Sequence, residues 1–96
     1  PEQQERVFTL SLQRSKWFLR KEIEKYVGKK INGIEITESG ILAAAHLAGA
    51  TSVRKYFKRQ GNYDFADGNG ITLQHYLKLF AGYDTSHIVP EEKPKI

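Results

Sequence analysis

The sequence predicts an all-α domain in which about four helices pack around an alanine-rich central helix, with a short β-hairpin-like connector near residues 30–36. Three observations lead to this fold class. Apolar residues recur at helical spacing along residues 3–27, an apolar run rich in alanine extends from Ile41 to Ala48, and a glycine follows each of four apolar segments. The length of 96 residues favours one domain with a modest core.

The first predicted helix covers residues 3–27. Its apolar positions recur at spacings near three, four and seven: Phe8, Leu12, Leu19, Ile23 and Tyr26. Most of its basic residues lie off this stripe, where Glu22 and Glu24 interrupt the positive charge. Gly28 is the expected end of the helix, because glycine adopts the left-handed conformation of a C-terminal cap at little cost.

The connector at residues 30–36 contains Asn32-Gly33 between β-branched residues, which is the strongest short signal of a β-hairpin. Its arms are too short for an independent sheet. We therefore expect a tiny hairpin or extended segment that places Ile31, Ile34 and Ile36 on the helical core.

The alanine-rich helix should begin after Thr37, a candidate N-cap. Glu38 then lies in the first turn, where the helix dipole favours an anion. The segment from Ile41 to Ala48 is apolar nearly all round, which predicts a central and closely packed position, and Gly49 ends it.

Two shorter helices complete the predicted domain. A basic helix runs from Val53 to Gln60 and ends at Gly61, with three residues facing inward: Val53, Tyr56 and Phe57. The last helix begins after Thr72 and ends at Gly82, with this apolar stripe: Leu73, Tyr76, Leu77 and Phe80. We expect residues 1–83 to form the single helical domain and residues 84–96 a flexible C-terminal tail or linker.

The composition narrows the function classes. Fifteen Lys and Arg residues against eleven acidic ones give a net charge of +4 and a pI near 9.4. This balance fits contact with an anionic partner, such as nucleic acid, lipid headgroups or wall polymers, and it also fits solubility alone. The absence of cysteine excludes disulfides and thiolate metal sites, and no apolar run is long enough for a membrane span.

The loop Asp64–Gly70 has some of the residues of a calcium loop. Aligned with an EF-hand, Asp67 and Asn69 fall at ligand positions, but the first ligand and the bidentate acid are missing. We expect a turn instead, in which Asp and Asn bond their own backbone. The three histidines have no paired ligand spacing, so we expect no metal and no cofactor.

The segment from Ala45 to Tyr56 has some features of a DNA-binding helix-turn-helix. Ala45 and Gly49 have the right spacing and a basic helix follows, but the next apolar residue, Val53, comes too early, so the turn is too short. The basic residues could still contact the phosphates of a nucleic acid or form a solvated face: Arg54, Lys55, Lys58 and Arg59.

Glu38-Ser39-Gly40 resembles the motif that holds the catalytic glutamate of goose-type lysozymes and soluble lytic transglycosylases. The segment from Ala44 to Tyr56 is similar to the alanine-rich stretch and the Val-x-x-Tyr helix in the C-terminal part of those domains. His46 and Leu47 stand where the enzymes have Tyr and Asn, and Glu38 lies directly before the alanine helix instead of many tens of residues away. A general acid needs an apolar pocket, whereas a helix N-terminus favours the ionised carboxylate.

The wider resemblance covers Lys16 to Tyr83. The segments 36–50, 53–57 and 67–70, followed by a Tyr-Leu-x-x-Phe helix, are similar to a small helical module of phage virion proteins and peptidoglycan-degrading proteins. In those proteins the module more often accompanies a hydrolase than acts as one. The resemblance therefore implies an accessory module without catalytic activity.

Four functional hypotheses follow. The first is an accessory module of a cell-wall-acting or phage-derived machine that binds peptidoglycan or docks a partner protein. The others are a basic nucleic-acid-binding domain, a purely structural interaction domain and a minimal muramidase that uses Glu38 as its catalytic residue. The candidate ligand-binding residues of the first hypothesis are polar or aromatic, although core positions also suit some of them: His46, Arg54, Tyr56, Tyr63 and Tyr83. The compartment stays open between virion-associated, periplasmic and exported.

Overall fold

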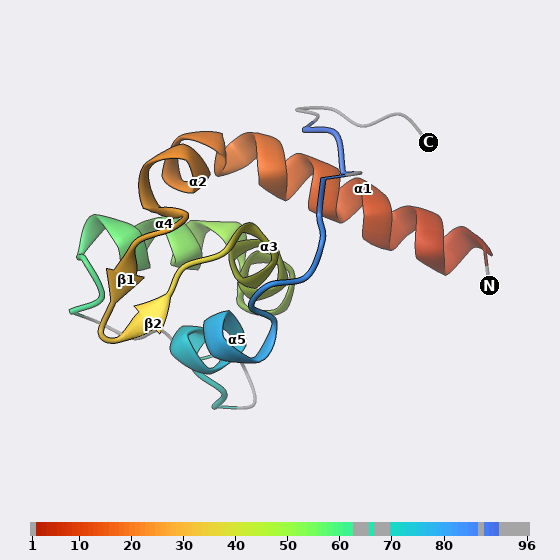
Figure 1. Cartoon of the computed structure of the whole chain (residues 1–96). Helices are drawn as coiled ribbons and strands as arrows, with labels where there is room; N and C mark the ends of the chain where they lie inside the picture. The colour runs from red at the N-terminus through yellow and green to blue at the C-terminus, as the bar shows by residue number, and fades with distance from the viewer. Residues whose placement is uncertain (1, 63–65, 67–69, 87, 91–96) are drawn as a thin grey trace.

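The computed structural model describes residues 2–62, 66, 70–86 and 88–90, with side chains from residue 10 onward. Its elements are α1 (Glu2–Phe18), α2 (Arg20–Tyr26), β1 (Lys30–Ile31), β2 (Ile34–Glu35), α3 (Glu38–Ala48), α4 (Ala50–Lys58) and α5 (Leu73–Leu79). The described part of the chain is mostly helical, which confirms the predicted class. In Figure 1, α1 runs across the top of the molecule, and its N-terminal half extends beyond the other helices.

The first predicted helix is two helices, α1 and α2, separated at Leu19. Leu19 has φ −100° and ψ 15°, and its side chain is completely buried. Arginine side chains donate to two backbone carbonyls here: Arg20 to Trp17 O at 2.9 Å and Arg54 to Phe18 O at 2.6 Å. Side-chain donors that reach helical carbonyls are a known cause of bends. The break therefore depends partly on Arg54, a residue of α4.

The predicted hairpin is confirmed. β1 and β2 pair antiparallel, with Ile31 opposite Ile34. Asn32 and Gly33 form the two-residue turn with φ 54° and 78°, the left-handed conformation that such turns require. Ile34 and Ile36 are buried in the core, and Ile31 packs against it.

The alanine-rich helix α3 begins as predicted. Thr37 Oγ1 accepts a hydrogen bond from Gly40 N at 3.1 Å, so Thr37 is the N-cap. α3 packs against α1, α4 and α5. Its small residues allow these close approaches: a Cβ added at Gly40 would lie 2.9 Å from the Leu77 carbonyl oxygen of α5.

Gly49 alone separates α3 from α4, with φ 99°. The three residues expected to face inward from α4 are all buried: Val53, Tyr56 and Phe57. α4 ends at Lys58, two residues before the predicted end. Thr72 caps α5, as predicted, by accepting from His75 N at 3.2 Å.

The chain after α5 returns toward α1. Thr85 contacts side chains of α1 and α3, and Ile88 is only 4% exposed. The division of the chain after residue 83 stays a prediction, and residues 91–96 lie outside the described residues. Among the described helices, none is both long and apolar enough to cross a membrane.

Candidate functional site

Glu38, the candidate catalytic residue, is engaged by two groups of the chain itself. Its Oε1 lies 3.2 Å from Lys16 Nζ, and its Oε2 accepts a hydrogen bond from Thr85 Oγ1. Lys16 Nζ also donates to the Thr85 carbonyl oxygen at 3.1 Å. The carboxylate therefore joins α1, α3 and the segment after α5.

Ser39 and Gly40 continue this set of contacts. Ser39 Oγ donates to the Phe80 carbonyl at 2.6 Å and accepts from Tyr83 N at 3.0 Å. Gly40 lies where any side chain would meet the backbone of Leu77. Each residue of the Glu-Ser-Gly motif thus has a packing or hydrogen-bonding contact that stabilises the fold.

The predicted ligand-binding residues lie on different elements. His46 is exposed on α3, with Nδ1 3.3 Å from Ser11 Oγ. Tyr56 is 1% exposed, and its hydroxyl donates to Gln74 Oε1 at 3.0 Å, which makes it a core residue. Tyr83 is 67% exposed after α5, and Tyr63 lies outside the described residues.

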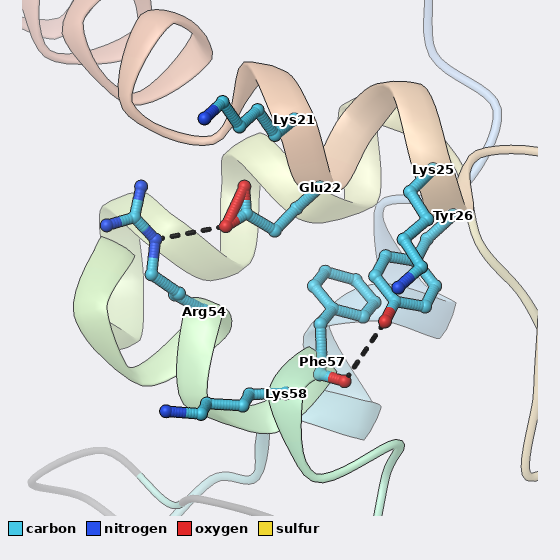
Figure 2. A pocket seen from close by; sticks show the side chains of 7 residues that line it. All are labelled: Lys21, Glu22, Lys25, Tyr26, Arg54, Phe57 and Lys58. Carbon is cyan, nitrogen blue, oxygen red and sulfur yellow. Dashed lines mark hydrogen bonds and ion pairs between the residues drawn. The ribbon is translucent and has the colours of Figure 1, made fainter.

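Arg54 is the described member of that set that lines a cavity between α2 and α4. The cavity has a volume of about 300 Å³ and is drawn in Figure 2. Its α2 lining consists of Lys21, Glu22, Lys25 and Tyr26. Its α4 lining consists of Arg54, Phe57 and Lys58.

The half-buried ring of Tyr26 forms an apolar wall of this cavity and stacks on the buried ring of Phe57. The Tyr26 and Phe57 ring centroids are 4.6 Å apart with an interplanar angle of 10°. The Tyr26 hydroxyl also donates to the Phe57 carbonyl at 3.3 Å, as the dashed line in Figure 2 shows. Because Phe57 is buried in the core, this wall is held firmly in place.

Arg54 is fixed by three contacts. Its Nε donates to Glu22 Oε1 at 3.0 Å, and its Nη2 donates to the Phe18 carbonyl. Its guanidinium lies 3.8 Å from the centroid of the Phe18 ring, in a cation–π contact. Arg54 is therefore a structural link between α4 and the α1–α2 bend as well as a lining residue.

The other charged side chains of the cavity have fewer ion pairs and hydrogen bonds than Arg54. Lys21, Lys25 and Lys58 are exposed, and none of them has an ion pair within the described part of the chain. Glu22 is mostly buried, and its Oε2 has no hydrogen-bond partner there. Four cationic side chains and one carboxylate, which pairs with Arg54, give the lining of the cavity a net positive charge.

Sequence analysis missed this cavity, although a signal for it exists. Lys21 and Lys25 are four residues apart on α2, and Arg54 and Lys58 are four apart on α4. Residues at this spacing lie on the same side of a helix, so the sequence already indicates that cationic side chains gather on one side of each of these two helices.

No metal site is found among the described residues. No group of three or more His, Asp or Glu side chains there could hold an ion. Most of the Asp64–Gly70 loop, namely residues 64, 65 and 67–69, lies outside the described residues.

Comparisons of the chain with protein-family models, with curated proteins and with solved structures return no match.

Proposed function

We propose that this chain is a non-catalytic accessory module of a cell-wall-acting or phage-derived machine and that it binds peptidoglycan. The cationic cavity between α2 and α4 carries the proposal. Peptidoglycan is a glycan mesh whose peptides bear carboxylates, which suit a site with cationic side chains and an aromatic wall. The resemblance of residues 16–83 to a module of peptidoglycan-degrading proteins points to the same ligand.

The contacts of Glu38 support a role without catalysis. A glycosidase acid must deliver a proton to the leaving oxygen of the substrate. Glu38 instead forms an ion pair with Lys16 and accepts a hydrogen bond from Thr85. Both of its oxygens are thus used to hold the fold together.

Co-sedimentation with purified, insoluble peptidoglycan tests this function. We expect the chain to pellet with the wall material at low salt and to be released as the salt concentration rises, because ionic attraction is screened. Insoluble cellulose is the control for non-specific adsorption. A chain that stays in the supernatant with both materials contradicts the proposal and leaves docking to a partner protein as the first alternative.

Nucleic acid is a second candidate ligand because of the exposed basic residues of α4. Lys55, Lys58 and Arg59 are all exposed on this helix or directly after it. Such a face can contact phosphates without sequence selectivity. Weak, salt-sensitive binding to any duplex is the expected form of this activity.

A further inference from the structure

The positive charge of the chain is concentrated in two segments of the sequence. Residues 20–30 and 50–62 contain nine Lys and Arg residues and two acidic ones, whereas the rest of the chain contains six and nine. These segments form α2, the start of the hairpin and α4, and α2 packs on α4 through the stacked rings of Tyr26 and Phe57. A basic region of this kind, next to a slightly acidic remainder, indicates an anionic partner.

A second cavity extends this basic region beyond Tyr26. It has a volume of about 330 Å³ and shares Tyr26 with the α2–α4 cavity. Its other lining residues come from the hairpin, the residue before it and the segment after α4: Lys29, Lys30, Ile31, Asn32 and Gln60. Because the two cavities lie on either side of one shared residue, a ligand that occupies both must be elongated.

The cationic side chains of the two cavities lack acidic partners. Five lysines in the two linings are exposed, and none of them has an ion pair within the described part of the chain: Lys21, Lys25, Lys29, Lys30 and Lys58. Those of the first cavity come from both helices, as Figure 2 shows. Glu22 is the acidic residue of the two linings, and it pairs with Arg54. Charges of one sign repel each other, so a ligand with several negative charges and no positive ones is favoured.

The type of cation favours phosphate groups. Lysine attracts a phosphate as a point charge, whereas arginine binds planar carboxylates with its two-pronged guanidinium. Arg54, the arginine of the two linings, already uses its guanidinium to contact Glu22 and the Phe18 carbonyl. The unpaired cations are therefore all lysines, which suit a chain of phosphates without requiring one fixed orientation of each group.

The aromatic residues of the linings do not favour nucleic acid bases. Proteins that bind single strands stack the bases on open aromatic rings. Phe57 is buried, and Tyr26 stacks on it with a centroid distance of 4.6 Å. Lys25 Nζ also lies 5.2 Å from the centroid of the Tyr26 ring. The two linings thus suit a phosphate backbone that carries no bases.

We propose that the two cavities beside Tyr26 form one binding surface for a linear polyol-phosphate polymer of the cell wall. Successive phosphates pair with Lys25 and Lys58 in the first cavity and with Lys29 and Lys30 in the second, and the polymer passes Tyr26 between them. This inference rests on the proposed function for its location in the cell wall. It adds a second wall component, which the chain recognises by the number and arrangement of its charges.

The test is a calorimetric titration of the full chain with glycerol-phosphate oligomers of defined length. The salt concentration is about 0.15 M, at which charges more than about 8 Å apart are largely screened. A short oligomer reaches one cavity and a long one reaches both. We expect the long oligomer to bind more tightly per phosphate, because its second contact is intramolecular. A single-stranded oligodeoxynucleotide with the same number of phosphates should bind no more tightly than the long oligomer, because its bases find no open ring.

Matched double variants locate the surface on the protein. Lys25→Gln with Lys58→Gln changes the first cavity, and Lys29→Gln with Lys30→Gln changes the second. Each pair should weaken binding of the long oligomer about tenfold, the expected effect of losing two phosphate contacts at this salt concentration.

The control variant has the same net charge. Arg14→Gln with Lys78→Gln removes two cations from exposed positions outside both linings and should leave binding unchanged. Thermal unfolding of all three double variants checks that the fold is retained.

Three results would overturn the inference. If the control variant loses as much affinity as the cavity variants, the overall charge of the chain attracts the polymer and the surface is wrong. If only one cavity variant loses affinity, the polymer does not span both cavities. If the oligodeoxynucleotide binds more tightly than the long oligomer, the bases contribute and the surface belongs to nucleic acid.

Sedimentation with peptidoglycan freed of phosphate polymers separates this inference from the proposed function. If the chain sediments with this material but does not bind the oligomers, the inference is wrong and the proposed function stands. If the oligomers bind through both cavities but the chain does not sediment, the assignment to peptidoglycan is overturned and the phosphate polymer remains as the ligand.

Discussion

Lys16 Nζ of α1 lies 3.2 Å from Glu38 Oε1 of α3, and the side chains are only 13% and 25% exposed. The Thr85 hydroxyl and carbonyl oxygen complete the contact, so three segments far apart in the sequence meet at one ion pair. Partial burial strengthens the attraction, because less water screens it. The pair is therefore a stabilising contact that also fastens the segment after α5.

Replacing Glu38 should test this role directly. We expect Glu38→Gln to lower the free energy of unfolding by about 1–2 kcal/mol, between the values for exposed and fully buried pairs. Urea denaturation measures the change. The control is a double-mutant cycle with Lys16→Met, in which the second substitution should cost less once Glu38 is absent. Fully additive costs would contradict an interaction between the two side chains.

The close contact of α3 with α5 gives a second prediction. Alanine is intrinsically better than glycine in a helix by about 1 kcal/mol, so Gly40→Ala should stabilise a free helix. Here the added Cβ would lie 2.9 Å from the Leu77 carbonyl oxygen. We expect net destabilisation of about 1–3 kcal/mol, as for overpacked cores. Thermal unfolding beside Thr51→Ala, an exposed helical control, shows whether the packing term exceeds the propensity term.

Local signals in the sequence predicted most of the fold. Thr37 and Thr72 cap their helices as expected, and Asn32-Gly33 forms the expected turn. These features depend on a few neighbouring residues, which a single sequence contains. The break at Leu19 depends partly on Arg54, thirty-five positions later in the chain, so the periodicity of residues 3–27 alone could not indicate it.

The candidate site was harder to predict, for the same reason. Arg54 was expected to contact a ligand, and it does line the cavity, but its contacts with Glu22 and Phe18 follow only from the packing of α4 on α2. Glu22 was noted only as an acidic residue that interrupts the positive charge of residues 3–27. Tyr56 was a candidate for binding, whereas burial and its bond to Gln74 make it part of the core. Residue type alone does not separate an aromatic wall from an aromatic core.

Tyr56→Phe should separate stability from binding. The variant removes the hydroxyl that donates to Gln74 Oε1 at 3.0 Å. We expect a loss of about 0.5–1.5 kcal/mol in the free energy of unfolding, the usual net value of one hydrogen bond. Sedimentation with peptidoglycan should not change, because the side chain is buried. Weaker sedimentation at unchanged stability would show that Tyr56 contributes to ligand binding.

Binding to duplex DNA should be weak and steeply dependent on salt. For B-DNA each neutralised phosphate contributes about −0.9 to the slope of log affinity against log salt concentration. Replacing Lys55, Lys58 and Arg59 together by Gln should remove most of this binding, measured by fluorescence anisotropy. Arg54 is left in place because its contacts hold α4 to the α1–α2 bend. Tight, sequence-selective binding would instead favour nucleic acid over peptidoglycan as the ligand.

Catalysis is the remaining alternative, and a release assay on labelled peptidoglycan decides it. The chain should not solubilise the label, because the only carboxylate in a lysozyme-like motif is paired with Lys16 and Thr85. Glu38→Gln should behave like the wild type in this assay and should still sediment with the wall. An active goose-type lysozyme is the positive control for the substrate. If the wild type releases label and Glu38→Gln does not, Glu38 is catalytic, and its contacts with Lys16 and Thr85 must open when substrate binds.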